Sequence, residues 1–230
     1  MPPGGPLGYW LFHGVTRVFP DAQGLYAASW SILLVSGPLM AVVVHQAAKT
    51  SLLKAALLAG PFLFFSLMPF NVEQFYPYPG ADGYGIYNRQ PSQLLYALVA
   101  GLLFVEGQWI KALIVGVSLL ALFLIKITGF LAALPLVALA LSTGRLSLGG
   151  LLGALTLLAV CLGGLEVTTG VVSAYLSDIF ALVALNDQRL LGALVKGAAI
   201  HVGIVPPLLL LIAVLVVMER AEFGAWLRAL

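Results

Sequence analysis

Long apolar runs separated by short polar breaks make up most of this chain. The run over residues 25–44 contains no charged side chain. A helix of about 20 such residues, rising about 1.5 Å per residue, is long enough to cross the hydrocarbon core of a bilayer. Further apolar runs occupy residues 52–70, 148–165, 167–185 and 201–218. The pattern therefore predicts an all-α fold, a polytopic bundle of transmembrane helices.

Two apolar runs do not have the length of a single straight span. Residues 92–105 are short for a span, and Pro91 suits the first turn of a helix that begins there. Residues 112–141 are longer than one unkinked span requires, and they are interrupted only near Lys126. We expect two short helices that meet at Lys126. With a weaker amphipathic piece near residues 190–200, this gives about eight membrane helices, some of them short or broken.

The remaining segments suit the membrane surface or the water beyond it. Residues 9–19 are apolar but too short to span, so we assign residues 1–24 to an outer juxtamembrane segment. Residues 71–93 are the one long polar stretch, and their Pro, Gly and Asp residues predict an outer loop with several turns. Residues 219–230 suit an interfacial helix. Residues 1–230 are thus interpreted as one integral membrane domain.

Positive charges set the expected orientation, because lysine and arginine are enriched in cytoplasmic loops. The predicted spans alternate in direction and divide the basic residues between two sides. One side receives Lys49, Lys54, Lys111, Arg145 and Arg189, and the other receives Arg17, Arg89 and Arg220. The first group is the larger, so we assign it to the cytoplasm and residues 71–93 to the outer face.

The composition excludes an ordinary soluble domain. The chain is 61% hydrophobic and 9% charged, whereas soluble domains are roughly 25% charged. A soluble fold of this size would expose large apolar patches and aggregate. The net charge of +2 comes without a basic run, which excludes nucleic acid as a partner. We therefore expect a protein of the bacterial inner membrane whose first partners are membrane lipids.

The sequence gives no support for a metal site. Cys161 is the single cysteine and lies inside an apolar run, so it is interpreted as a small core residue. The histidines, His13, His45 and His201, are far apart and lack the spacing of metal ligands. We expect neither a metal nor a cofactor.

Ionisable side chains within apolar runs are candidates for function. Such a group costs on the order of 2.5–3.5 kcal/mol at the centre of a membrane helix. Lys126, Glu166 and Asp178 meet this criterion. Lys126 and Glu166 stand at predicted helix breaks, where each could instead reach the membrane surface. For Asp178, the alternative is a buried, hydrogen-bonded carboxylate with a structural role.

The predicted outer loop carries a second candidate site at Tyr87, Asn88 and Arg89. An arginine at the entry to a helix, where backbone N–H groups also point, could bind a lipid-linked phosphate through charge-assisted hydrogen bonds. Aromatic rings beside it could stack on sugar faces. The alternative is a solvated loop whose tyrosines belong to an interfacial aromatic belt.

Two stretches of the chain resemble GT-C glycosyltransferases of the protein mannosyltransferase and aminoarabinose transferase kind. The first is PPGGPLGYWLFHGVTRVF at residues 2–19, which is similar to the segment after the first outer acidic motif of those enzymes. The second is LFLIKITGFLAALPLVALAL at residues 122–141. It is similar to their paired short helices, where a Lys-x-Thr-Gly break precedes an apolar run with proline. The two stretches also follow the family's order.

The resemblance implies a polyprenyl-phosphate-linked sugar donor, an outer-face active site and an acidic residue that activates the acceptor. It implies contacts from Arg89 and Lys126 to the anionic donor. In the family, the acidic residue lies in the first outer loop after an initial span, and neither precedes Pro2 here. We therefore expect either a piece of a longer enzyme or a relative that does not catalyse, and no catalytic residue is carried over.

Two other classes of function fit the same residues. A transporter or flippase would use Lys126, Glu166 and Asp178 to line a path near the bilayer midplane. A non-catalytic subunit would act as a scaffold for other membrane subunits. Handling of a polyprenyl-linked sugar in envelope glycan assembly is the leading hypothesis.

Overall fold

A computed structural model of the chain describes residues 5–21, 24–67 and 83–186. Every regular element within these ranges is an α-helix, so the all-α class is confirmed for this part of the chain. The chain divides into two units, residues 1–178 and 179–230. The first eight helices belong to the first unit, and the last described helix crosses the boundary.

The shortest described helix has 8 residues, and the two longest have 22 residues. In chain order, the helices are α1 (Pro6–Val18), α2 (Gly24–Ser31), α3 (Leu33–Thr50), α4 (Leu52–Leu67), α5 (Gly83–Phe104), α6 (Gln108–Ile125), α7 (Ile127–Ser142), α8 (Leu148–Thr169) and α9 (Val171–Asn186).

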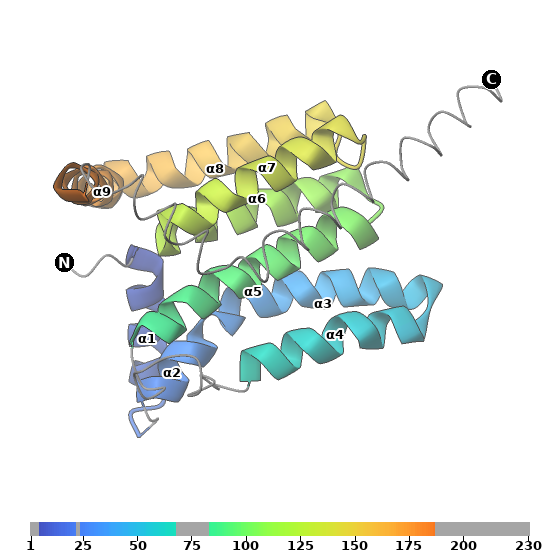
Figure 1. The fold of residues 1–230 in the computed structure, drawn as a ribbon, viewed down its shortest axis with the longest axis horizontal. Coiled ribbons are helices and arrows are strands. Elements are labelled where there is room, and N and C mark those ends of the chain that lie inside the picture. Colours follow the sequence, from blue (N-terminus) through green and yellow to red (C-terminus); the bar gives the residue numbers. More distant parts are fainter. Residues whose placement is uncertain (1–4, 22–23, 68–82, 187–230) are drawn as a thin grey trace. The chain divides into compact units, whose positions relative to one another are not determined.

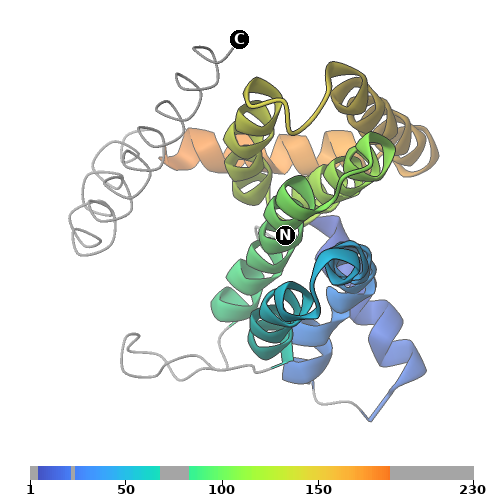
Figure 2. The same cartoon turned by 90° about the vertical axis from the view of Figure 1, so that its right-hand side faces the viewer.

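Helices α3 to α8 run alternately in opposite directions, side by side (Figure 1). Three tight connections lie at one end of this bundle, at Ser51, at residues 105–107 and at residues 143–147. We call this the hairpin end, and Figure 2 is viewed from it. At the opposite end lie α1, α2 and the junction between α6 and α7 at Lys126. We call this the break end.

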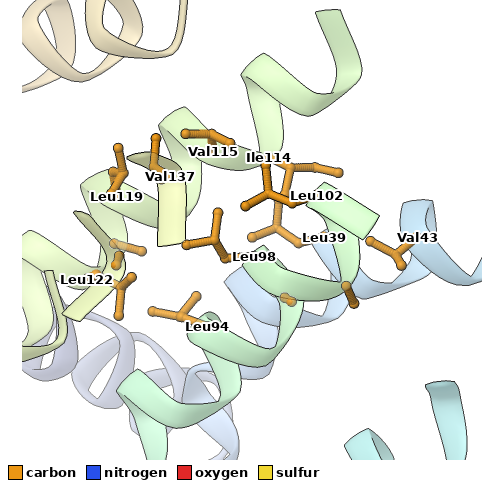
Figure 3. Packing of buried hydrophobic residues seen from close by; sticks show 14 of the residues in the cluster. Leu39, Val43, Leu94, Leu98, Leu102, Ile114, Val115, Leu119, Leu122 and Val137 are labelled. Atoms are coloured by element: carbon orange, nitrogen blue, oxygen red, sulfur yellow. The ribbon is translucent and has the colours of Figure 1, made fainter. Parts of the chain in front are cut away.

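Helix α6 lies at the centre of the first unit. It packs most extensively on α8 and then on α5, with α7 and α1 also in contact. Its apolar side chains interdigitate with those of the neighbouring helices (Figure 3). The cluster includes Leu39 and Val43 from α3, Leu94, Leu98 and Leu102 from α5, Ile114, Val115, Leu119 and Leu122 from α6, and Val137 from α7. Burial of these side chains fixes the positions of the helix ends, where the polar residues lie.

Small residues bring α6 and α8 close together. A Cβ atom added at Gly116 would lie 2.8 Å from a methyl of Leu157 and 3.1 Å from the carbonyl oxygen of Ala154. At Gly153, an added Cβ would meet only ordinary contacts, at 3.7 Å from Ala112 and Trp109. Close approach of backbones at small residues is the usual packing mode of helices in membranes.

Two helices of the described part are long and apolar enough to cross a bilayer, α6 and α8. Over its most apolar window α6 is 67% buried within the fold, whereas α8 is only 11% buried. Helices α4 and α7 are apolar but shorter. Length and composition thus point to membrane association.

The single span predicted over residues 25–44 is broken in the structure. Helix α2 ends at Ser31, and α3 then runs from Leu33 to Thr50. Just after the break, the Ser36 hydroxyl donates to the Ile32 carbonyl at 3.1 Å, and Pro38 inside α3 has no N–H to donate to Leu34.

The loop predicted over residues 71–93 is shorter than expected at its second boundary. Helix α5 begins at Gly83 and contains Pro91 in its interior, rather than starting at residue 92. A proline inside a helix removes one backbone hydrogen bond and is tolerated where neighbouring helices support the segment. Residues 71–82 of that loop lie outside the described part, as do residues 190–200, 201–218 and 219–230 with their predicted helices.

The predicted meeting of two helices at Lys126 is confirmed. Lys126 has extended backbone angles, φ −158° and ψ 116°, and it both ends α6 and precedes α7. The next junction differs from the prediction, since Glu166 lies within α8 and the break falls at Gly170. Gly170 has φ 62°, a left-handed conformation that glycine adopts without strain.

Candidate functional site

The break at Lys126 is held by backbone hydrogen bonds on both sides. The Lys126 N–H donates to the Leu122 carbonyl at 2.8 Å, which completes α6. Its own carbonyl accepts from the N–H groups of Gly129 at 2.9 Å and Phe130 at 3.2 Å, which starts α7. The extended residue between two helices is therefore a fixed feature rather than a frayed end. Partial burial lowers the pKa of the Lys126 ammonium below its ordinary value.

The N-terminal segment closes over the end of α6. The Gly5 N–H donates to the Ile125 carbonyl at 2.7 Å, one of the last carbonyls of α6, which has no partner inside its own helix. A Cβ atom at Gly5 would collide with the carbonyl oxygen of Leu124. Only a residue without a side chain can approach the backbone this closely. The stretch that starts α1 therefore touches the residue next to Lys126.

Two further contacts complete the surroundings of the break. The Ile127 N–H donates to the Tyr175 hydroxyl at 3.2 Å. The Tyr175 ring packs edge-on against Phe123, with centroids 5.8 Å apart. On the other side, Gly129 faces Pro91, and a Cβ at Gly129 would lie 2.9 Å from the proline ring. Residues of α5 and α9 thus contact the helix ends on either side of Lys126.

Arg89 joins α5 to the end of α4. Its guanidinium donates to the Phe65 carbonyl at 2.7 Å and lies 4.9 Å from the centre of the Phe65 ring. The Trp30 indole N–H donates to the Leu67 carbonyl at 3.3 Å. These two side chains bind carbonyl groups at the C-terminal end of α4. Arg89 therefore links α5 to α4 at the break end, and its predicted contact with a substrate stays a prediction.

Tyr87 and Asn88, the other two residues of that predicted site, lie in the first turns of α5. Their backbone is helical, and their side chains lie outside the described part of the structure. The prediction that they contact a substrate stays a prediction.

Glu166 serves as a cap for the next helix. Its carboxylate accepts from the backbone N–H groups of Val172 and Ser173, each at 3.0 Å, at the start of α9. A carboxylate at a helix N-terminus satisfies orphan donors and opposes the positive end of the helix dipole. Asp178 lies exposed on α9 and is not a buried carboxylate. Lys126 and Glu166 lie near helix ends, and neither is at the middle of the bundle.

Buried polar side chains in α3 and α5 were not identified from the sequence. Gln93 is 1% exposed, and its amide oxygen is 3.4 Å from the Ser36 hydroxyl. Gln90 is also buried. Two amides three residues apart at the start of an apolar helix are a signal for a shared buried face, because residues at this spacing are neighbours on a helix.

Within the described ranges, no group of three or more His, Cys, Asp or Glu side chains could hold a metal ion. No family model matches the chain, and neither the curated proteins nor the solved structures contain a match.

Proposed function

We propose that this chain is a polytopic integral membrane protein that handles a polyprenyl-phosphate-linked sugar at its break end, as a GT-C-like component of bacterial envelope glycan assembly. One observation carries the proposal. The two stretches that resemble the family are about 100 residues apart in the sequence, yet they meet where Gly5 donates to Ile125. A contact between them is what a shared substrate-handling site would require.

The break offers chemistry that suits a lipid-linked phosphate. Lys126 is a half-buried basic residue, and the phosphate of a lipid could accept a charge-assisted hydrogen bond from its ammonium. The N-terminus of α7 follows directly, and a helix N-terminus favours negative charge. The exposed Thr128 adds a hydroxyl on the first turn. A phosphate that approached this end would therefore meet two positive features, the Lys126 ammonium and the N-terminal end of the α7 dipole.

Membrane embedding of the bundle is supported by the outward faces of its helices. Helix α8 leaves most of its apolar surface outside the fold, and α4 exposes Leu52, Leu57 and Phe64. Contiguous apolar surface of this kind is rare on proteins surrounded by water and normal on proteins surrounded by lipid. Lipid acyl chains would cover these faces.

The placement of ionisable groups supports this proposal more than a transporter. A transport path would need such groups near the bundle's middle. In the described part of the chain, Lys126 lies at a helix junction and the Glu166 carboxylate is engaged with the start of α9. Apolar side chains such as Leu98, Ile114 and Leu119 fill the space between α5 and α6, as Figure 3 shows.

The proposal predicts that Lys126→Gln weakens binding of a polyprenyl phosphate about tenfold. A charge-assisted hydrogen bond is worth roughly 1.5–3 kcal/mol, and 1.4 kcal/mol corresponds to a factor of ten. The full chain, purified in detergent, would be titrated with polyprenyl phosphate, and bound lipid would be counted by native mass spectrometry. Lys54→Gln is the matched control, because Lys54 is an exposed lysine at the hairpin end.

Two results would contradict the proposal. One is wild-type protein that binds the uncharged polyprenol as well as the phosphate. The other is a folded Lys126→Gln variant that binds polyprenyl phosphate as tightly as the Lys54→Gln control.

A further inference from the structure

A second group of basic residues lies at the hairpin end, far along α6 from Lys126. The ammonium of Lys111 donates to the Arg145 carbonyl at 2.7 Å, and Lys111 is only 6% exposed. The Gln108 side chain accepts from the Ser147 N–H at 2.9 Å. These two bonds fasten the turn between α7 and α8 to the first turn of α6. We call Gln108, Trp109, Lys111 and Arg145 the basic corner.

The corner has more positive than negative charge. Lys111 experiences repulsion from Arg145 and attraction from the nearby Glu106. Among the described residues, the connections and adjoining helix turns at the hairpin end contain Lys49, Lys54, Lys111 and Arg145 against the single acid Glu106. Of the three N–H donors of the Lys111 ammonium, the Arg145 carbonyl takes one. An anion at this corner would balance the positive charge that is in excess among the described residues of the corner.

The shape of the corner suits a lipid headgroup better than a dissolved ion. The Arg145 side chain is exposed, and the Trp109 side chain is 80% exposed. The Trp109 ring lies beside Gly153, in the second turn of α8. Tryptophan rings settle at the level of lipid headgroups, and basic residues between helices at a membrane surface bind anionic headgroups. A phosphate at Arg145 would place its acyl chains along the apolar face of α8.

We infer that the basic corner binds the phosphate of an anionic phospholipid, with Arg145 in direct contact and Trp109 against the glycerol and upper acyl region. The inference rests on the proposed membrane embedding, but it concerns the opposite end of the bundle from the proposed sugar-handling site. Lys111 is a positioning residue, because its ammonium binds the Arg145 carbonyl. Its charge attracts the lipid phosphate without touching it.

The experiment uses the full chain in detergent, titrated with phosphatidylglycerol or with phosphatidylcholine, and bound lipid is counted by native mass spectrometry. The wild type should prefer phosphatidylglycerol. Arg145→Gln should reduce phosphatidylglycerol binding about fivefold, as expected for roughly 1 kcal/mol per basic residue at a membrane surface. Arg145→Lys should keep most of the binding, and Lys54→Gln should bind like the wild type.

The outcomes separate this inference from the proposed function. Equal binding of both lipids by the wild type, or unchanged phosphatidylglycerol binding by Arg145→Gln, would overturn the lipid site while leaving the break end untouched. Displacement of the lipid by inorganic phosphate would overturn the assignment to a phospholipid. A chain that is monodisperse without detergent would instead overturn the membrane embedding itself. Because the Arg145 side chain is exposed in a turn, its replacement should leave the fold intact.

Discussion

Gly170 and Glu166 together form the joint between α8 and α9. Gly170 turns the chain in the left-handed region, at φ 62°, and its N–H donates to the Glu166 carbonyl at 2.8 Å. The Glu166 side chain then reaches past this turn to the first N–H groups of α9. One residue thus closes the end of one helix with its backbone and the start of the next with its carboxylate.

We expect Gly170→Ala to destabilise the protein by about 1–2 kcal/mol, because an L-residue with a Cβ is strained in the left-handed region. Gly163→Ala is the matched control in the same helix. Gly163 has ordinary helical φ, and no atom lies within 4 Å of its added Cβ, so this change should keep or slightly raise stability. Thermal unfolding of both purified variants in one detergent would test the difference, and equal loss in the two would be inconsistent with it.

The pairing of α6 with α8 decides where the two ends of the bundle lie. It is the most extensive helix contact in the first unit, and its closest point is at Gly116. The neighbours of Gly116 there include the Ala154 backbone, which cannot rotate away as a side chain could. The α7–α8 turn, with Arg145, reaches the start of α6 because of this pairing.

We therefore predict that Gly116→Ala costs about 1–3 kcal/mol through overpacking between two backbones. Gly153→Ala, at ordinary contact distance on the same interface, should change stability by less than about 0.5 kcal/mol. The measurement is the denaturation midpoint of each variant in matched micelles. A Gly116→Ala protein as stable as Gly153→Ala would mean that the helices are not this close.

Sequence reasoning succeeded where the signal was local. A lysine inside an overlong apolar run correctly located the junction of α6 and α7 at Lys126. It failed at two helix boundaries. The uncharged run over residues 25–44 was predicted as one span although α2 ends at Ser31, and Pro91 was interpreted as a helix start although α5 runs through it and packs on Gly129.

The contacts of the candidate site could not be predicted from the local sequence either. The contact between Gly5 and Ile125 joins residues 120 apart in the chain, so no window of the sequence contains it. Arg89 was identified as a basic residue near a helix start, but its partner Phe65 lies on another helix. The role of Glu166 as a cap depends on the exact place of the turn, which falls four residues later than its position suggested.

Charged residues are distributed unevenly between the two ends of the first unit. In the part of the chain that the structure describes, the hairpin end contains four basic residues and one acidic residue in its connections and adjoining turns. The break end mixes Arg17, Arg89 and Lys126 with Asp21 and Glu166. Since basic residues are retained on the cytoplasmic side during insertion, the hairpin end is expected inside.

This orientation can be tested by thiol labelling of intact cells. In a Cys161→Ser background, Arg17→Cys should react with a membrane-impermeant maleimide, because residue 17 is exposed at the outer end. Lys54→Cys, equally exposed at the hairpin end, should react only after the cells are permeabilised. The reverse pattern would invert the assignment of both ends.

The extended residue between α6 and α7 places the negative C-terminal end of the α6 dipole beside the positive N-terminal end of the α7 dipole. The negative end of α6 is partly neutralised where Gly5 donates to Ile125, and at the positive end of α7 the Ile127 N–H donates to the Tyr175 hydroxyl. The electrostatic potentials of these two helix ends cancel at a distance, so an electric field remains only close to the junction. An anion in solution would hardly sense this spot from afar, whereas one already carried along the membrane by a lipid tail would feel it on arrival.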